Sequence, residues 1–217
     1  MKNLVIIGAG GQGRETAQLV KDINKQRKTW DLLGYLDDNT QLTGKKFNGY
    51  PVLGSINTLK RHEFRNAFVT CAIGDSKIRK KVLELIEDQV DNLRYATLIH
   101  PTAVVGDETI IEQGTIVCAN SVITTNVKIG RHVIVNYGST IGHDTEIKDF
   151  VTVLPGSNVS GNVKLLEAVD IGSGVTIIPQ IEIGAYSIVG AGAVVTKNLP
   201  GYCTAVGIPA KPIKYHK

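Results

Sequence analysis

The fold is decided by residues 111–147, which read IEQGTIVCANSVITTNVKIGRHVIVNYGSTIGHDTEI. An aliphatic side chain returns here at every sixth residue, and the pattern continues in both directions without a break. The aliphatic positions are Ile99, Val105, Ile111, Val117, Ile123, Ile129, Val135, Ile141, Ile147, Val153, Val159, Leu165, Ile171, Ile177, Ile183, Val189 and Val195. Two residues before each of them the side chain is small or β-branched, as at Ser121, Ser139 and Ser157. This period predicts a triangular prism of stacked coils, each built from three six-residue units.

The length of the repeat sets the size of the prism. Residues 99–195 at about 18 residues per coil predict roughly five coils. The unbroken register also predicts that no large loop is inserted between them.

The repeat resembles that of the hexapeptide-repeat acyltransferases, which fold as a left-handed parallel β-helix. Residues 206–211, VGIPAK, resemble the segment that closes this fold beside the acyl-CoA site. The resemblance implies a left-handed β-helix with a C-terminal tail over residues 97–217. It also implies a homotrimer whose active sites lie between neighbouring subunits.

Residues 1–96 have a different pattern, in which short apolar runs alternate with longer charged amphipathic stretches. The runs at 3–7, 32–36 and 67–73 predict strands, and 14–26 and 77–89 predict helices. This alternation predicts a small α/β domain with a parallel sheet, of Rossmann-like type. In the second helix we expect Ile78, Val82, Leu85 and Ile86 to form the packed face, with Asp75 or Ser76 as the N-cap.

Composition excludes several classes of protein. The 24 Lys and Arg against 20 Asp and Glu leave a formal charge of +4 on 217 residues, and the basic residues are scattered, which disfavours nucleic-acid binding and a basic membrane patch. Cys71, Cys118 and Cys203 have no paired spacing, so we expect reduced thiols and no thiolate metal site. The first apolar run, residues 4–7, is too short for a signal peptide or a membrane span. A cytoplasmic protein is therefore expected.

A glycine-rich loop follows the first predicted strand. Residues 8–13, GAGGQG, fit GxGxxG between a strand and a helix, where glycines let the backbone approach a diphosphate. An NAD site is the usual interpretation, and Asp37 and Asp38 stand where an acidic residue would hold the ribose. However, fewer than 100 residues are short for dinucleotide binding and lack the second half of that fold.

The whole chain resembles the nucleotide-amino-sugar N-acetyltransferases and the related sialic acid O-acetyltransferases. In these enzymes the small N-terminal domain holds the UDP or GDP of a nucleotide sugar. The substrate contacts that the resemblance implies are Gly10, Gly11 and Gln12 at the diphosphate, Asp37 and Asp38 at the nucleoside, and Gly74 at the sugar. The family usually has histidine at the position of Gln12.

His143 is the predicted catalytic base. It lies in residues 136–144, NYGSTIGHD, which match the family motif of a catalytic histidine followed by Glu or Asp. Acetyl transfer needs a group that removes a proton from the acceptor, and imidazole titrates near neutral pH. Asp144 could pair with the second ring nitrogen only if the chain turns a corner there, because successive strand residues face opposite sides. Of the other histidines, we expect His62 and His216 to be solvated and His100 to be structural, and His132 is the next candidate base.

Acetyl-CoA is the implied cosubstrate. The resemblance implies that Thr152 contacts the acetyl group, at a position where many relatives have a second histidine. The other implied cofactor contacts are Gly161, Ser173, Ala191 and Lys211.

These observations favour an acetyl-CoA-dependent N-acetyltransferase acting on a nucleotide-linked 4-amino sugar. Three alternatives remain: a sialic acid or other sugar O-acetyltransferase, a non-catalytic nucleotide-sugar-binding scaffold, and a metal hydrolase of the γ-carbonic-anhydrase type. The last needs three converging histidines, and His100, His132 and His143 differ in phase along the 18-residue coil, so no metal is expected.

Overall fold

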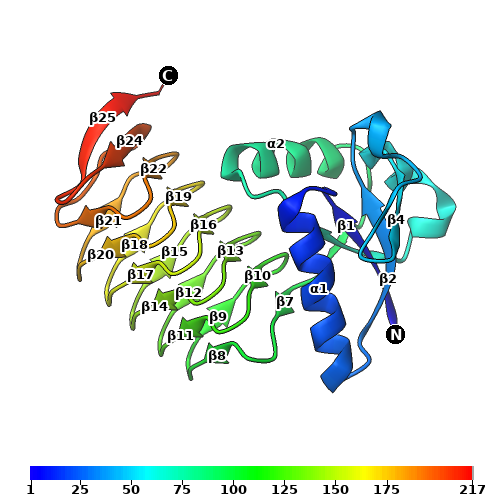
Figure 1. The fold of residues 1–217 in the computed structure, drawn as a ribbon, viewed down its shortest axis with the longest axis horizontal. Helices are drawn as coiled ribbons and strands as arrows, with labels where there is room; N and C mark the ends of the chain where they lie inside the picture. The colour runs from blue at the N-terminus through cyan, green and yellow to red at the C-terminus, as the bar shows by residue number, and fades with distance from the viewer. Residues whose placement is uncertain (217) are drawn as a thin grey trace.

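The computed structural model describes residues 1–216 and consists of an α/β part packed against a parallel β-helix (Figure 1). The α/β sheet has the strand order β3-β4-β2-β1-β5-β6, and only β3 runs antiparallel to its neighbour. Its strands are β1 (Lys2–Ile7), β2 (Trp30–Leu36), β3 (Lys46–Phe47), β4 (Tyr50–Gly54), β5 (Phe68–Cys71) and β6 (Arg94–Tyr95). The helices are α1 (Gly11–Gln26) and α2 (Ser76–Glu87), with 3-10 turns η1 (Thr40–Leu42), η2 (Ile56–Lys60) and η3 (His62–Phe64).

The central strand β1 is covered on both faces. Leu4 and Ile6 belong to one hydrophobic cluster with residues of α1, while Val5 and Ile7 belong to another with residues of α2. All four side chains are fully buried. An uninterrupted apolar run is what a parallel strand between two helical layers requires, so the predicted α/β architecture is confirmed.

Helix α2 differs from the prediction in the face that it buries. Asp75 is the N-cap, since its side chain accepts a hydrogen bond from the Ile78 backbone N–H at 2.9 Å. The buried residues of the helix, however, are Ser76, Arg79, Leu83 and Ile86. Ile78 and Leu85 are half exposed. The prediction is confirmed for Ile86 and for Val82, which packs against the same cluster, and wrong for Ile78 and Leu85. Ser76 and Arg79 are buried instead because the surface that α2 meets offers polar acceptors.

The β-helix contains seventeen two-residue strands, and every third strand lies in the same wall of the prism. The first wall comprises β7 (Leu98–Ile99), β10 (Ile116–Val117), β13 (Ile134–Val135), β16 (Thr152–Val153), β19 (Asp170–Ile171) and β22 (Ile188–Val189). The second comprises β8 (Val104–Val105), β11 (Val122–Ile123), β14 (Thr140–Ile141), β17 (Asn158–Val159), β20 (Thr176–Ile177) and β23 (Val194–Val195). The third comprises β9 (Ile110–Ile111), β12 (Lys128–Ile129), β15 (Glu146–Ile147), β18 (Lys164–Leu165) and β21 (Glu182–Ile183).

Each predicted aliphatic position is the second residue of one of these strands, and from Val117 onward every one of them is buried in the core of the prism. The small residues preceding them close the coils with hydrogen bonds: the hydroxyls of Thr115, Ser121 and Ser139 each donate to a backbone carbonyl fifteen residues later. The helix is left-handed, as the resemblance implied.

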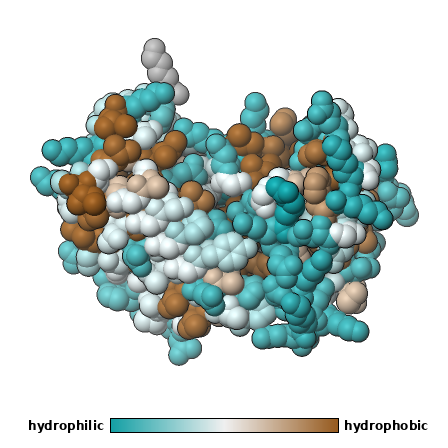
Figure 2. Space-filling model, in the orientation of Figure 1, coloured by the Kyte–Doolittle hydropathy of each residue, from teal (hydrophilic) through white to brown (hydrophobic). Residues whose placement is uncertain are grey.

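The two parts share one hydrophobic core. Leu98, Ile116 and Ile134, which face outward on the first wall, are buried in the cluster that contains Leu19 and Val20 of α1. At the other end a hairpin of β24 (Cys203–Val206) and β25 (Lys211–Tyr215) extends the first wall. Figure 2 shows hydrophobic surface at this end of the molecule, where Ile208, Ile213 and Tyr215 are exposed.

Candidate functional site

A pocket of about 380 Å³ opens at the carboxyl ends of β1, β2 and β5. In this sheet the chain moves one way from β1 to β2 and later returns to the other side of β1 to form β5. Parallel sheets leave a crevice at such a switch point. The pocket lining contains all six residues predicted to contact the substrate: Gly10, Gly11, Gln12, Asp37, Asp38 and Gly74.

The glycine loop presents the N-terminus of α1 to this pocket. Gly10 is the N-cap, and no side chain within residues 1–216 caps the helix there. The first-turn N–H groups therefore remain directed toward a ligand, and an anion is the ligand that such groups favour. A Cβ at Gly13 would collide with the carbonyl of Gly8, so this glycine allows α1 to lie close to β1.

The two acidic residues have different local roles. The Asp37 carboxylate accepts hydrogen bonds from the Ala9 N–H at 2.8 Å and the Asn39 N–H at 2.9 Å, which ties the glycine loop to the end of β2. Asp38 is exposed and accepts from the Ile56 N–H at 2.9 Å. Asp37 therefore builds the pocket, and Asp38 is the more open of the two toward a nucleoside.

Gln12 connects the pocket with the β-helix. Its Oε1 lies 3.5 Å from Nδ2 of Asn136, a buried residue that follows β13. Its Nε2 is buried without a hydrogen-bond partner in the described part of the chain. An unpaired buried amide donor is costly, so the Gln12 NH₂ group is available to donate to a ligand. Asn136 was not predicted as a site residue, although an amide side chain two residues before the corner glycine Gly138 was a usable signal.

His143 and Asp144 form a pair at the edge between the second and third walls. The His143 Nδ1 lies 2.7 Å from Oδ2 of Asp144. Asp144 has a φ of +58°, so the chain turns the corner that this pairing requires. The two side chains are 60% and 47% exposed, and the hydrogen bond from His143 holds the pKa of Asp144 below its ordinary value. With Nδ1 held by a carboxylate, Nε2 is the ring nitrogen left to accept a proton.

Gly161 lies one coil after His143 on the same edge. A Cβ at this glycine would lie 2.6 Å from Nε2 of His143 and 2.7 Å from its Cε1. The imidazole therefore covers the backbone of Gly161, and these two predicted residues are neighbours.

The remaining predicted cofactor contacts lie elsewhere in the chain. Ser173 and Ala191 are exposed on the edge between the first and second walls, and Lys211 is exposed on β25. Thr152 is buried in the first wall, where its hydroxyl donates to the carbonyl of Gly74 at 2.8 Å. Because that hydroxyl has only one hydrogen, the acetyl contact implied for Thr152 has no donor to use in this arrangement.

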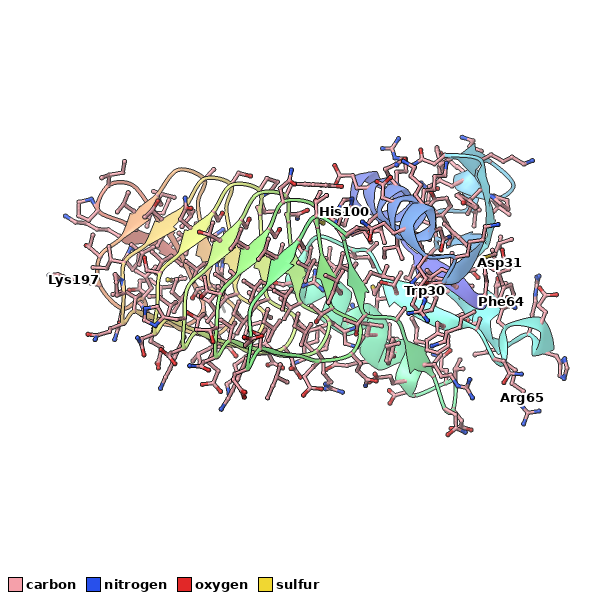
Figure 3. All side chains as sticks on the ribbon, turned by 90° about the horizontal axis from the view of Figure 1, so that it is seen from below. Trp30, Asp31, Phe64, Arg65, His100 and Lys197 are labelled. Carbon is pink, nitrogen blue, oxygen red and sulfur yellow. The ribbon has the colours of Figure 1, made fainter. Side chains whose placement is uncertain are left out.

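His132 and His100 lie on other edges of the prism. His132 is buried on the edge between the third and first walls, between Tyr95 and Phe150, and burial lowers its pKa to about 4. It is therefore inaccessible as a base. His100 lies where the first coil meets α1 (Figure 3), with Nε2 3.5 Å from Asp22.

The range 1–216 contains neither a cluster of metal ligands nor a membrane-spanning helix. No group of three or more His, Cys, Asp and Glu in this range could hold a metal ion. No helix within it is both long and apolar enough to cross a membrane.

Comparison with known proteins gives consistent matches. The model of the PglD N-terminal domain matches residues 3–86. GDP-perosamine N-acetyltransferase of Escherichia coli O157:H7 is 39% identical over 132 residues, which are 60% of this chain and 58% of that protein. The chain thus matches somewhat more than half the length of this curated relative.

Two solved structures match over nearly the whole chain. The acetyltransferase domain of PglB from Neisseria gonorrhoeae has 33% identity and a TM-score of 0.89, covering 98% of this chain and 100% of that one. PerB from Caulobacter crescentus, in complex with CoA and GDP-perosamine, has 29% identity and a TM-score of 0.89, covering 99% and 98%. Structures of that enzyme with one histidine replaced by Asn or Ala also contain CoA and GDP-perosamine.

Proposed function

Because this chain belongs to the family of hexapeptide-repeat acetyltransferases with a PglD-type N-terminal domain, we propose that it transfers the acetyl group of acetyl-CoA to a nucleotide-linked amino sugar. The acceptor is the amino group of a UDP- or GDP-linked 4-amino sugar. The observation that carries this proposal is the pairing of a glycine-loop pocket with an oriented, exposed histidine on a hexapeptide coil.

The substrate's diphosphate lies at the N-terminus of α1, against Gly10 and Gly11, where free N–H groups and the helix dipole stabilise its charge. Asp38 faces the nucleoside. Gln12 and Gly74 line the end of the pocket nearest the β-helix, so the sugar points toward the coils.

His143 acts as the general base. The amino nitrogen attacks the thioester carbonyl, its proton passes to Nε2 of His143, and CoA leaves as the thiolate when the tetrahedral intermediate collapses. Asp144 stabilises the imidazolium through Nδ1. A positioned base of this kind contributes about 10²- to 10⁴-fold in rate.

The pocket and the base of one chain lie on opposite sides of the second wall. Gln12 contacts Asn136, at the edge between the first and second walls, whereas His143 lies on the edge beyond the second wall. Ser173 and Ala191 share the edge of Asn136. A complete site therefore needs two copies of the chain. The edge of one copy that carries His143 must lie beside the edge of another copy that carries Asn136 and the pocket.

The chemistry of the walls supports this assembly. The outward residues of the second wall are uncharged: Val104, Val122, Thr140, Asn158, Thr176 and Val194. On the third wall Ile110 is followed by Lys128, Glu146, Lys164 and Glu182, a ladder of alternating charge. We propose a homotrimer in which second walls meet around a threefold axis and third walls face solvent, and we propose that it works in the cytoplasm.

The test is CoA release in the presence of acetyl-CoA and a panel of UDP- and GDP-4-amino sugars, with sialic acid as the hydroxyl acceptor. We expect turnover with a nucleotide amino sugar. Turnover with sialic acid alone would replace the proposal by O-acetylation. In calorimetry, micromolar NAD(H) binding without binding of any nucleotide sugar would overturn the assignment of the pocket.

A further inference from the structure

Arg79 is a fully buried cation between the two parts of the molecule. It lies in the first turn of α2, with 0% of its surface exposed. Helix α2 lies alongside the first wall near β13 and β16 (Figure 1). The mechanism proposed above does not use this residue, and a charge so buried requires full hydrogen bonding.

The guanidinium joins three segments that are distant in the sequence. Nε donates to the carbonyl of His132 at 3.0 Å, and Nη2 donates to the carbonyl of Phe150 at 2.6 Å. Nη1 donates to the carbonyls of Ile73 at 2.6 Å and Gly74 at 3.1 Å. Nε and Nη2 of the guanidinium thus bind the coils of the β-helix, and Nη1 binds the loop between β5 and α2.

Thr152 closes a triangle with these groups. Its Oγ1 accepts from Nη2 of Arg79 at 3.0 Å and donates to the carbonyl of Gly74 at 2.8 Å. The Gly74 carbonyl therefore receives one hydrogen bond from a residue of α2 and one from a residue of β16. Gly74 also lines the pocket, so this triangle connects the pocket rim directly to the β-helix.

At Gly74 itself the rim is held through hydrogen bonds to the carbonyl. A Cβ built at Gly74 would meet no atom of the described residues within 4 Å. The loop is thus not wedged by neighbouring side chains at this point. Burial lowers the pKa of Arg79 to about 10, so the guanidinium remains charged at neutral pH and its hydrogen bonds keep the strength of charged donors.

We propose that Arg79 and Thr152 are positioning residues, which hold Gly74 at a fixed place over the coil of β16 and thereby set where the sugar end of the substrate lies for acetyl transfer. The inference rests on the proposed function for the identity of the substrate. It assigns Thr152 a role different from the acetyl contact that the family resemblance implied.

The test compares Thr152→Val with Thr70→Val. Valine is close to threonine in shape but lacks the hydroxyl, so Thr152→Val removes both hydrogen bonds without opening a large cavity. Thr70 is also buried, and its hydroxyl has no partner among residues 1–216, so Thr70→Val makes the same chemical change without touching the rim. Thr152→Ser is the conservative variant that retains the hydroxyl.

For Thr152→Val we expect kcat/KM for the nucleotide amino sugar to fall about 10-fold or more. The Kd values for acetyl-CoA and for the free nucleoside diphosphate should stay within about twofold, because neither ligand needs the sugar-side rim. Thr152→Ser should recover most of the loss, and Thr70→Val should match the wild type. Arg79→Lys removes the guanidinium with its several donors and should show the same selective fall in kcat/KM. If Arg79→Lys fails to fold, the comparison of Thr152→Val with Thr152→Ser decides the question.

Two results would overturn the inference: wild-type kcat/KM in Thr152→Val, or a loss of acetyl-CoA affinity in that variant, which would restore the acetyl contact. Calorimetry of the nucleotide sugar against the nucleoside diphosphate makes the same comparison without turnover. Failure of the positioning role would appear in the comparison of Thr152→Val with the wild type. Failure of the proposed function would appear as absence of turnover in the wild type, so the two results are distinguishable.

Discussion

The imidazole of His143 occupies the space that a side chain at Gly161 would fill, because the two residues stand 18 positions apart on the same edge of the prism. The glycine is therefore a condition for the orientation of the proposed base. The Asp144 carboxylate holds the ring from one side and the Gly161 backbone supports it from below.

Gly161→Ala should displace the His143 ring while leaving the fold intact, because an exposed side chain can rotate away from the new methyl group. We expect kcat to fall about 10- to 100-fold with little change in melting temperature. In the His143→Ala background, adding Gly161→Ala should lower kcat hardly any further. An equal loss in both backgrounds would show that Gly161 acts independently of the histidine.

His143→Ala should lower kcat by about 100-fold or more, because the attacking amine loses its proton acceptor. The acetyl-CoA Kd, measured by calorimetry, should change little, since the predicted contacts Ser173 and Ala191 lie on another edge and Lys211 lies on β25. Near-wild-type turnover at neutral pH would remove His143 from the mechanism. His132 would not replace it, because that ring is buried.

Asp144→Asn should reduce kcat less than His143→Ala does. Protonated His143 then loses the carboxylate that stabilises it, so the acidic limb of the kcat profile should move to lower pH. Rate measurements between about pH 5 and pH 8 would show this movement of the acidic limb. An unchanged acidic limb would mean that the Asp144 pairing does not influence the reacting group.

Val122→Asp should break the proposed trimer, because it places a charge on the uncharged second wall, between Val104 and Thr140. Light scattering should then show a mass near that of one 23.4 kDa chain, with loss of activity. Ile110→Asp is the matched control on the third wall, where the new carboxylate would stand opposite Lys128. If Ile110→Asp dissociates the protein and Val122→Asp does not, the proposed interface is on the wrong wall.

His132 should make the fold sensitive to acid. Burial, followed by the charges of Arg131 and Arg79, lowers its pKa from 6.5 to about 4, so the unfolded chain binds a proton more readily than the folded one. Stability present above pH 6.5 should therefore be lost as the pH falls toward 4, by up to about 3 kcal/mol. His132→Leu should flatten this dependence in urea unfolding measured at a fixed protein concentration. If the unfolding free energy of His132→Leu depends on pH as steeply as that of the wild type, other groups cause the acid sensitivity.

The period of six determined the β-helix from the sequence alone, because each inward aliphatic residue packs against its equivalents in the coils before and after it. The strand, glycine loop and helix at residues 2–26 follow one another in the sequence, so their pattern is also visible without the tertiary structure. Gly10, Gly11 and Gln12 could therefore be placed at a pocket from their spacing. The His143 and Asp144 pair could also be predicted, apart from the corner that lets two successive side chains meet.

Only the tertiary structure decided which surface of α2 is buried and what Thr152 contacts. Arg79 and Thr152 are 73 positions apart, and the Thr152 hydroxyl meets a carbonyl 78 positions away. Such contacts form when the α/β part docks on the first wall, and no local periodicity encodes that placement. The docking supplies carbonyl acceptors that stabilise a buried guanidinium. A position that polarity alone predicts to face solvent therefore lies at the centre of the molecule.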